Sequence, residues 1–373
     1  MDMTQVTFIG HPRVSIGKAA ECRSYAASLA CLGYEPSVYD IYGESDAEPW
    51  IDCDGFRLPM AQSLGEGIRI WHINGDEVEG VFRHLTAQGQ QPRLGYNIMV
   101  PAWELSRYPE SWRPFIAEFD EVWAISRFVR EIIAGFSERP VIHISQPTTR
   151  IAGAPLSRAD FGIREDAFVF LSFMDASSYL ERKNPAGIME LYRRLRMRNP
   201  YKRFVFALKI KEREGSSKVA KSESLLRDPN FIVIDRNLAE SEMTGLFSLS
   251  DSFVSLHRAE GFGRGVGEAM SQGLPVIATS YSGVLDMMTG TNSWPLPYQL
   301  VPVQEGEYPH HADQVWADPD IDAAVAACEE VMNMPEERKR RVRRASLDLE
   351  TQFSHAAVGL RMSDRLSQIA ADG

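Results

Sequence analysis

The segment from Ser255 to Thr279 carries the residues whose types and spacing are best suited to chemistry. Glu260 and Glu268 lie in it with seven residues between them. Four glycines alternate with other residues in the same stretch: Gly261, Gly263, Gly265 and Gly267. Glycines let the backbone approach a ligand and expose its N–H groups, and a helix that begins here would direct its positive N-terminus to the same place. Carboxylates beside such a loop can accept hydrogen bonds from vicinal hydroxyls. The segment therefore predicts a site for phosphate or for sugar hydroxyls.

Two other interpretations of this glycine-rich segment were weighed. A dinucleotide-binding loop of the GxGxxG type needs a third glycine at position 266, where the sequence has Val266. The segment also lies late in the chain, whereas such a loop belongs to the first strand–helix turn of its domain. The other interpretation is a tight turn with two solvated glutamates. We favour the phosphate and sugar site.

The string Glu-Gly-Phe-Gly at 260–263, followed by Glu-Ala-Met at 268–270 and Pro-Val-Ile-Ala-Thr at 275–279, resembles family 4 of the retaining nucleotide-sugar glycosyltransferases, which have the two-domain GT-B fold. The resemblance covers the chain well from about Gly95 to the C-terminus and loosely before it. Further matches are weaker when taken alone; they lie at 103–112, 121–129, 181–185, 281–283, 292–293, 300–303 and 316–320. The first two resemble bacterial members that assemble polysaccharides.

The resemblance implies a role for each matching residue on the donor side. Glu268 would hold the ribose hydroxyls, and Glu260 would orient hydroxyls of the transferred sugar. Lys183, together with Arg182, would neutralise the diphosphate as its bond to the sugar breaks, because charge develops there in the transition state. Backbone N–H groups would contact the sugar and the diphosphate from four positions: Phe262, Gly263, Arg264 and Gly265.

Three more residues of this half follow or end predicted strands and could contact the donor. Lys209 lies in the predicted strand Phe204–Ile210, and His257 and Arg258 directly follow the strand Phe253–Leu256. Ligands of parallel sheets bind at the carboxyl ends of strands. An outward lysine and a structural histidine are equally expected at these positions, and Arg258 could be a second cation for the diphosphate.

Three residues are candidates on the acceptor side. Ser15 and Gly17 lie between the first predicted strand and the first predicted helix, where the family carries a turn with two glycines, of which only Gly17 is present here. Glu104 follows the predicted strand Tyr96–Val100 and could face the cleft. A capping or surface role is the alternative for this glutamate.

Short apolar runs alternate with longer amphipathic segments along the whole chain, which predicts parallel sheets covered by helices. A stretch with proline and glycine and little periodicity interrupts the alternation at 149–163. We therefore predict an α/β protein of GT-B type, with two doubly wound Rossmann-like domains facing across a cleft. The acceptor-side domain would span 1–148 and the nucleotide-sugar-binding domain 164–350, and a C-terminal helix at 351–373 would pack back on the first domain.

Composition narrows the class of protein. The 373 residues include 40 Lys and Arg and 51 Asp and Glu, which gives a net charge of −11. This balance argues against nucleic-acid binding, since phosphates must be met by basic side chains. No apolar stretch approaches the ~20 residues of a membrane helix. We expect a cytoplasmic protein; a weak peripheral contact with the inner face of a membrane, through Arg338–Arg344, is the alternative to a solvated helix with i,i+4 ion pairs.

The resemblance also implies that neither metal nor cofactor is required. In the C-terminal half Asp318 and Asp320 form a DxD pattern, and we expect both to cap the next helix. The expected activity is retaining transfer of a hexosyl unit from a nucleoside diphosphate sugar to a hydroxyl of a glycan or lipid-linked glycan in polysaccharide biosynthesis. The alternatives are a non-catalytic nucleotide-sugar-binding protein and a nucleotide-sugar epimerase on the same fold.

Overall fold

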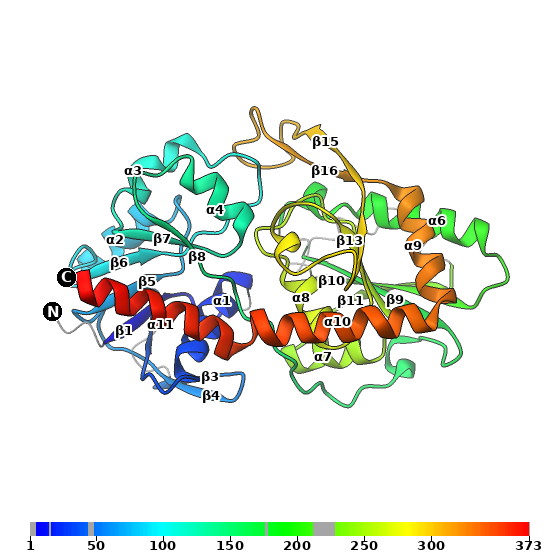
Figure 1. The fold of residues 1–373 in the computed structure, drawn as a ribbon, viewed down its shortest axis with the longest axis horizontal. Coiled ribbons are helices and arrows are strands. Elements are labelled where there is room, and N and C mark those ends of the chain that lie inside the picture. Colours follow the sequence, from blue (N-terminus) through cyan, green and yellow to red (C-terminus); the bar gives the residue numbers. More distant parts are fainter. Residues whose placement is uncertain (1–4, 15, 44–47, 176–177, 212–227, 373) are drawn as a thin grey trace. The chain divides into compact units, whose positions relative to one another are not determined.

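A computed structural model describes residues 5–14, 16–43, 48–175, 178–211 and 228–372. The chain divides into two compact units (Figure 1). The first comprises Met1–Thr149 together with Glu350–Gly373, and the second comprises Arg150–Leu349. The predicted helix at 218–226 lies outside the described residues.

The first unit is built on a parallel sheet of six described strands. In spatial order they are β2 (Ser37–Asp40), β1 (Val6–Gly10), β5 (Ile68–Trp71), β6 (Tyr96–Met99), β7 (Glu121–Ala124) and β8 (Val141–His143). Strands β1, β5 and β7 are buried along their whole length, as expected where helices cover both faces of a parallel sheet. The helices of this unit are α1 (Gly17–Ala30), α2 (Val78–Ala87), α3 (Arg113–Ile116), α4 (Arg127–Ala134) and α11 (His355–Asp372).

The C-terminal helix α11 packs against α1, as Figure 1 shows. The two helices approach so closely that a Cβ at Gly359 would overlap the Ser28 carbonyl. Arg365 of α11 makes an ion pair with Glu121, a fully buried carboxylate of β7, at 2.5 Å. Close packing against α1 and the ion pair with the buried Glu121 thus hold the last helix on the first unit.

The second unit repeats the architecture with a different strand order. Its parallel sheet of described strands runs β11 (Phe231–Asp235), β10 (Phe204–Lys211), β9 (Phe168–Asp175), β12 (Ser252–Ser255), β13 (Val276–Thr279) and β14 (Trp294–Leu296). In chain order this is 3-2-1-4-5-6, the doubly wound arrangement, whose order reverses between β9 and β12. The helices are α5 (Leu180–Lys183), α6 (Pro185–Arg198), α7 (Glu240–Ser248), α8 (Arg264–Ser271), α9 (Ile321–Asn333) and α10 (Pro335–Phe353).

The core of the second unit forms where α6 and α9 pack on its sheet. Phe170 and Phe206 stack with ring centroids 5.2 Å apart, and Tyr192 of α6 packs edge-on against Phe206 at 5.9 Å. These rings are fully buried, so each contributes about 1.5–3 kcal/mol by leaving water. This packing makes the sheet rigid, so the carboxyl ends of its strands can hold a site.

The predicted α/β architecture is confirmed, and the strands predicted at Tyr96–Val100, Phe204–Ile210 and Phe253–Leu256 lie within one residue of their observed bounds. The short edge strand β14 was not predicted. Two antiparallel hairpins were missed: β3 (Trp50–Cys53) with β4 (Phe56–Pro59), and β15 (Tyr298–Pro302) with β16 (Val315–Pro319). Their strands are short and partly exposed, so they lack the continuous apolar signal of the central strands.

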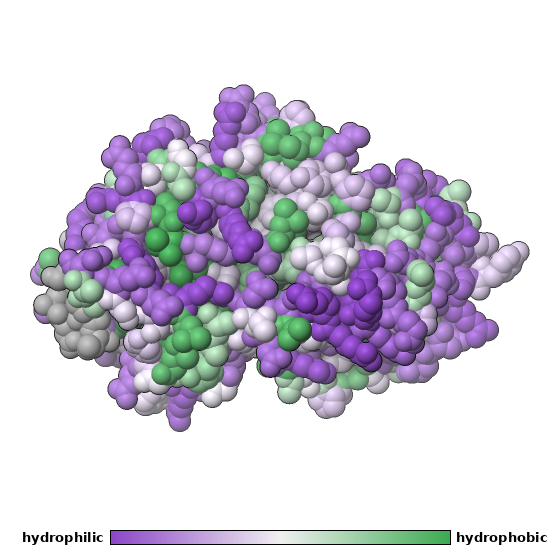
Figure 2. All heavy atoms as spheres, in the orientation of Figure 1, coloured by the Kyte–Doolittle hydropathy of each residue, from purple (hydrophilic) through white to green (hydrophobic). Residues whose placement is uncertain are grey.

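The basic cluster of α10 is paired within its own helix. Lys339 contacts Glu336 at 2.9 Å, and Glu337 accepts from Arg340 at 2.6 Å and from Arg341 at 2.7 Å. Hydrophilic side chains accordingly gather over α10 on the face in Figure 2. The helix begins at Pro335, whose ring suits the first turn. Within the described ranges, no helix combines the length and apolar character needed to cross a membrane.

Candidate functional site

The candidate site lies where the strand order of the second unit reverses. The chain leaves β9 toward α5 and leaves β12 toward the glycine-rich loop, so the two connections come together at the carboxyl ends of neighbouring strands. This is the position at which open α/β sheets bind ligands. Lys183, Arg182 and Phe173 come from the β9 side, and His257 and Glu260 come from the β12 side.

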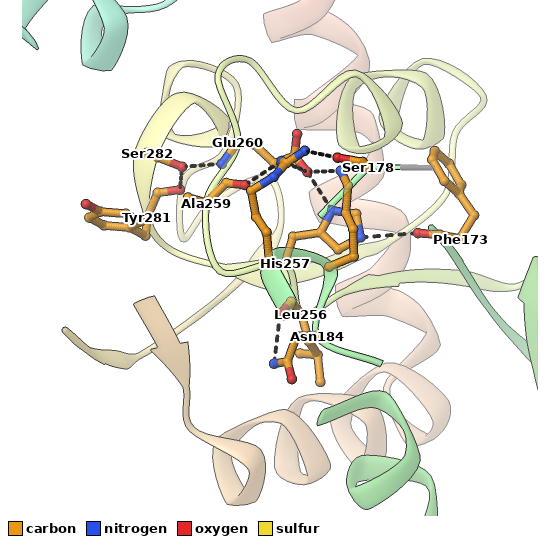
Figure 3. A network of polar contacts seen from close by, with 11 residues as sticks. Phe173, Ser178, Asn184, Leu256, His257, Ala259, Glu260, Tyr281 and Ser282 are labelled. Carbon is orange, nitrogen blue, oxygen red and sulfur yellow. Dashed lines mark hydrogen bonds and ion pairs between the residues drawn. The ribbon is translucent and has the colours of Figure 1, made fainter. Parts of the chain in front are cut away.

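The carboxylate of Glu260 is the centre of this site (Figure 3). Its Oε1 atom lies 2.6 Å from Lys183 Nζ, 2.7 Å from His257 Nδ1 and 3.2 Å from Arg182 Nη1. The Glu260 side chain is only 16% exposed. Two cations and one imidazole therefore converge on a single carboxylate oxygen that is largely shielded from water.

Electrostatics fix the charge of Glu260. Burial alone would raise the pKa of this carboxyl, but the positive charges of Lys183 and Arg182 outweigh it and hold the pKa well below its usual value. Burial and the charge of Lys183 lower the pKa of His257 to about 4, although Glu260 acts in the opposite direction. His257 is therefore neutral at pH 7. Its one N–H can serve only one of the two acceptors that face it, Glu260 and, at 3.2 Å from Nε2, the Phe173 carbonyl.

The guanidinium of Arg182 is held on several sides. It donates from Nη1 to the Ala259 carbonyl at 2.9 Å and from Nη2 to Ser178 Oγ at 3.0 Å. The backbone N–H of Arg258 also donates to the Arg182 carbonyl at 2.8 Å. Because this arginine is buried, the two oxygen acceptors stabilise its charge and direct it toward Glu260, while the backbone hydrogen bond fixes the position of its main chain.

A sharp turn at Asn184 places Arg182 and Lys183 at the site. Asn184 has a φ of 51°, in the left-handed region, and ends α5 at the same time as it caps α6. Its side chain accepts from Gly187 N at 3.0 Å and donates to the Leu256 carbonyl at 3.1 Å. Pro185 then starts α6 with its φ already set for a helix. The sequence Arg-Lys-Asn-Pro thus encodes the turn locally.

The glycine-rich loop ends in the first turn of α8. Gly263 has a φ of 92° and is the N-cap residue of this helix. A Cβ here would overlap Val284, and a Cβ at Gly265 would overlap the ring of Phe173. Glycines are therefore required because the helix N-terminus packs directly against β9 and against the segment after β13. Phe262, which directly precedes Gly263, is buried.

Ser282 fixes the backbone of Glu260, a role that sequence reasoning missed. Glu260 N donates to Ser282 Oγ at 2.8 Å (Figure 3). Gly283 N donates to the Glu260 carbonyl at 2.9 Å. Ser282 itself has a φ of 65°. The segment 281–283 was singled out only for its resemblance, and nothing in it signals a contact with a residue 22 positions away.

Three of the predicted donor-side side chains have other partners. Glu268 is partly exposed and accepts from Arg264 Nη2 at 2.9 Å, one turn away on α8. Lys209 is buried on β10 and donates to the Ile210 carbonyl at 2.6 Å, and burial lowers its pKa to about 8 even though Asp235 opposes the shift. Arg258 pairs with Asp318 at 3.2 Å. Contacts of these residues with a donor stay predictions.

The two aspartates of the DxD pattern have different positions. Asp320 caps α9, as predicted, by accepting from Asp322 N at 2.9 Å and from Ala323 N at 3.0 Å. The prediction for Asp318 is wrong, because this residue lies in β16 and pairs with Arg258. Among the described residues, no group of three or more His, Cys, Asp or Glu is placed to hold a metal ion. The absence of a metal requirement stays a prediction.

Two of the three acceptor-side candidates lie in the described part of the first unit. Gly17 is the first residue of α1, and a Cβ there would meet open space. Glu104 is half-buried in the segment that follows β6. Ser15 lies outside the described residues. Contacts of these residues with an acceptor stay predictions.

A buried cluster that the sequence analysis missed lies at the carboxyl ends of strands in the first unit. Glu21 accepts from Gln146 Nε2 at 2.5 Å, lies 2.9 Å from His72 Nδ1 and contacts Lys18 at 3.3 Å. Burial raises the pKa of Glu21, but Lys18 and His72 outweigh that effect and lower it overall. One signal was available, since His72 lies within the predicted strand Ile68–Ile73 and Lys18 and Glu21 share a helix face.

Comparison with known proteins agrees with this architecture. Residues 155–293, which contain the Glu260 site, match the family model described as "Glycosyl transferases group 1", and this supports a domain of that type in the second unit. A comparison with curated proteins found no match.

Solved structures resemble the whole chain in fold. Sucrose-phosphate synthase from Thermosynechococcus elongatus has 14% identity and a TM-score of 0.69, over 99% of this chain and all of that one. A glycosyltransferase from Rickettsia africae has 12% identity and a TM-score of 0.66, over the full length of both chains. Anabaena HepE in complex with UDP and glucose has 12% identity and a TM-score of 0.68, over 98% and 99%. The fold is therefore GT-B.

Proposed function

We propose that this protein is a retaining hexosyltransferase that requires no metal. It would move a hexosyl unit from a nucleoside diphosphate sugar to a hydroxyl of a glycan or lipid-linked glycan, in the cytoplasm and in polysaccharide biosynthesis. The observation that carries the proposal is the convergence of Lys183, Arg182 and Glu260 at the strand-order reversal, inside the segment that matches the glycosyltransferase family model.

The chemistry follows from the charges at this site. Lys183 and Arg182 would contact the diphosphate, and their fixed charges would stabilise it as the bond from the anomeric carbon to the phosphate oxygen breaks. The bonding electron pair leaves with the phosphate. The acceptor hydroxyl attacks the anomeric carbon from the same face, and its proton passes to an oxygen of the leaving phosphate. Configuration is thereby retained.

Glu260 would serve the sugar. Its carboxylate is ionised because its pKa is held low, so it can accept hydrogen bonds from hydroxyls of the transferred hexose. The nucleotide would lie toward Glu268, and the backbone N–H groups at the start of α8 would face the diphosphate. Similar structures support donors of this class, since HepE is in complex with UDP and glucose and the pneumococcal O-GlcNAc transferase GtfA is in complex with UDP and GlcNAc.

A binding screen followed by a transfer assay tests the proposal. Wild-type protein is heated with UDP, GDP, ADP and their sugars, since a ligand that binds the folded state raises the melting temperature. Lys183→Ala should reduce binding of the nucleoside diphosphate and abolish transfer, whereas Lys339→Ala, on the exposed face of α10, should change neither. Binding without transfer to any glycan or lipid-linked acceptor would instead indicate a non-catalytic binding protein. Interconversion of the bound sugar would indicate an epimerase.

A further inference from the structure

The β15–β16 hairpin and its connecting residues 303–314 contact the two arginines that flank Glu260. These residues follow the segment 155–293 that matches the family model, so the match does not assign them a role. The outer surface of the hairpin is exposed, including Leu300 at 54%. Its inner side chains are buried against the site, which indicates that one side of the hairpin faces solvent and the other has a specific packing partner.

Arg258 anchors the base of the hairpin. Ala317 N donates to the Arg258 carbonyl at 3.0 Å, and Asp318 Oδ1 lies 3.2 Å from Arg258 Nη2. The guanidinium carbon of Arg258 also lies 5.4 Å from the ring centroid of Trp316, which is fully buried. Backbone, charge and ring contacts thus join β16 to the residue that follows β12.

Tyr308, in the connection between the two strands, reaches Arg182. The guanidinium carbon of Arg182 lies 5.9 Å from the centroid of the Tyr308 ring, within the range of a cation–π contact. Tyr308 is 7% exposed and packs in turn against Tyr179, with centroids 4.3 Å apart. The Arg182 guanidinium also contacts the Ala259 carbonyl, Ser178 and Glu260, so the aromatic ring is one of four groups around it.

This ring matters because Arg182 lies close to a second cation. Lys183 and Arg182 both contact one oxygen of Glu260, so their two positive charges lie close together and repel each other. This arrangement is stable only where the surrounding groups favour positive charge. A ring face attracts a guanidinium and excludes water from it. When a diphosphate binds to both cations, the same ring keeps Arg182 in position.

We propose that Tyr308 is a positioning residue for the diphosphate subsite, acting through Arg182, and that the β15–β16 hairpin is the element that carries it. The proposal rests on the proposed function, since it assumes that Arg182 meets a nucleoside diphosphate. Tyr308 itself acts through its π face and its apolar bulk.

The test compares Tyr308→Phe, which keeps the ring, with Tyr308→Leu, which keeps apolar volume and loses the π face. Calorimetry with UDP, GDP and ADP, each alongside its nucleoside, measures the diphosphate contribution separately. The diphosphate that binds wild type should bind Tyr308→Leu about five- to tenfold more weakly, given the strength of a partly desolvated cation–π contact. Its nucleoside should bind as before. Tyr308→Phe and Leu300→Ala should match wild type.

Tyr179→Ala supplies a second variant at an exposed position, in case the buried substitution lowers the melting temperature. This variant should bind the diphosphate about two- to threefold more weakly, since it removes only the ring that supports Tyr308. Equal diphosphate binding by wild type, Tyr308→Leu and Tyr179→Ala, or equal losses for nucleoside and diphosphate, would overturn the inference alone. Failure of wild type to bind any of the three diphosphates would overturn the proposed function and this inference with it.

Discussion

Lys183 and Glu260 are joined by a 2.6 Å contact between Nζ and Oε1, across 77 positions of sequence. The cation expected to meet a diphosphate is thus already paired with the carboxylate expected to meet the sugar. A phosphate that approaches Lys183 must compete with Glu260 for it. Under the proposed function, donor binding and release of Glu260 toward the sugar hydroxyls would therefore be linked through one ammonium group.

This linkage predicts an unusual phenotype for Glu260→Gln. The amide keeps the shape but removes the charge that competes with phosphate, so UDP or the other preferred diphosphate should bind at least as tightly as to wild type. Transfer should fall by about 10²-fold or more, the range found when a single polar group at a reacting centre is lost. Calorimetry and an initial-rate assay measure the two effects, and weaker diphosphate binding by this variant would contradict the competition.

His257 gives the second unit a pH dependence of stability. Its pKa is about 4 in the folded protein because burial and Lys183 disfavour the charged ring, against about 6.5 when unfolded. The unfolded chain therefore binds more protons between these values, and stability is lost as the pH falls from about 6.5 to 4. The loss from pH 7 to pH 5 should be about 2 kcal/mol for this group.

Urea unfolding of wild type and His257→Gln at pH 7 and pH 5 measures this contribution. The variant should lose less stability than wild type over the same pH step, whatever its stability at pH 7. The pKa of Glu260 is also lowered, so this carboxyl likewise reduces stability as the pH falls. Its effect begins only at lower pH, near its usual pKa of 4.5. Equal pH steps in the two proteins would show that His257 is not buried in its neutral form.

The Arg365–Glu121 ion pair should be a large contributor to the stability of the first unit. Glu121 is fully buried and also accepts from Trp123 Nε1 at 2.6 Å. Arg365→Ala would leave this carboxylate without its cation, which costs about 3–5 kcal/mol for a buried pair. Asp364→Ala, at an exposed position one residue away, is the control. Urea unfolding followed by tryptophan fluorescence measures both, and equal midpoints would refute the prediction.

Gly263→Ala should damage the candidate site through the backbone. At a φ of 92° an alanine is strained by about 1–2 kcal/mol, and its Cβ would overlap Val284. The start of α8 must then shift, so the variant should melt at a lower temperature and bind the preferred diphosphate less well. Gly290→Ala is a matched control, because a Cβ there meets open space and needs no left-handed backbone. Identical thermal shifts for both variants would contradict the requirement for glycine.

Several features of the fold could be predicted because their signals are local. Continuous apolar runs mark the buried strands, and Asn184 followed by Pro185 marks the turn into α6. Strand β15 could not be predicted in the same way. Its residues Tyr298 and Leu300 are exposed, and the strand is stable because it pairs with β16. A strand that depends on its partner leaves little periodicity of its own.

The sequence by itself determined which residues stand at the carboxyl ends of strands, and with them the chemistry of Glu260, Lys183 and Arg182. Only the tertiary structure decided which of these residues meet. Strand ends 77 positions apart come together because β9 and β12 are neighbours in the sheet, and strand order depends on packing of the whole unit. The same packing directs Arg258 to Asp318 and brings Tyr308 to Arg182. Local patterns set the direction of each strand, whereas long-range contacts select its neighbours.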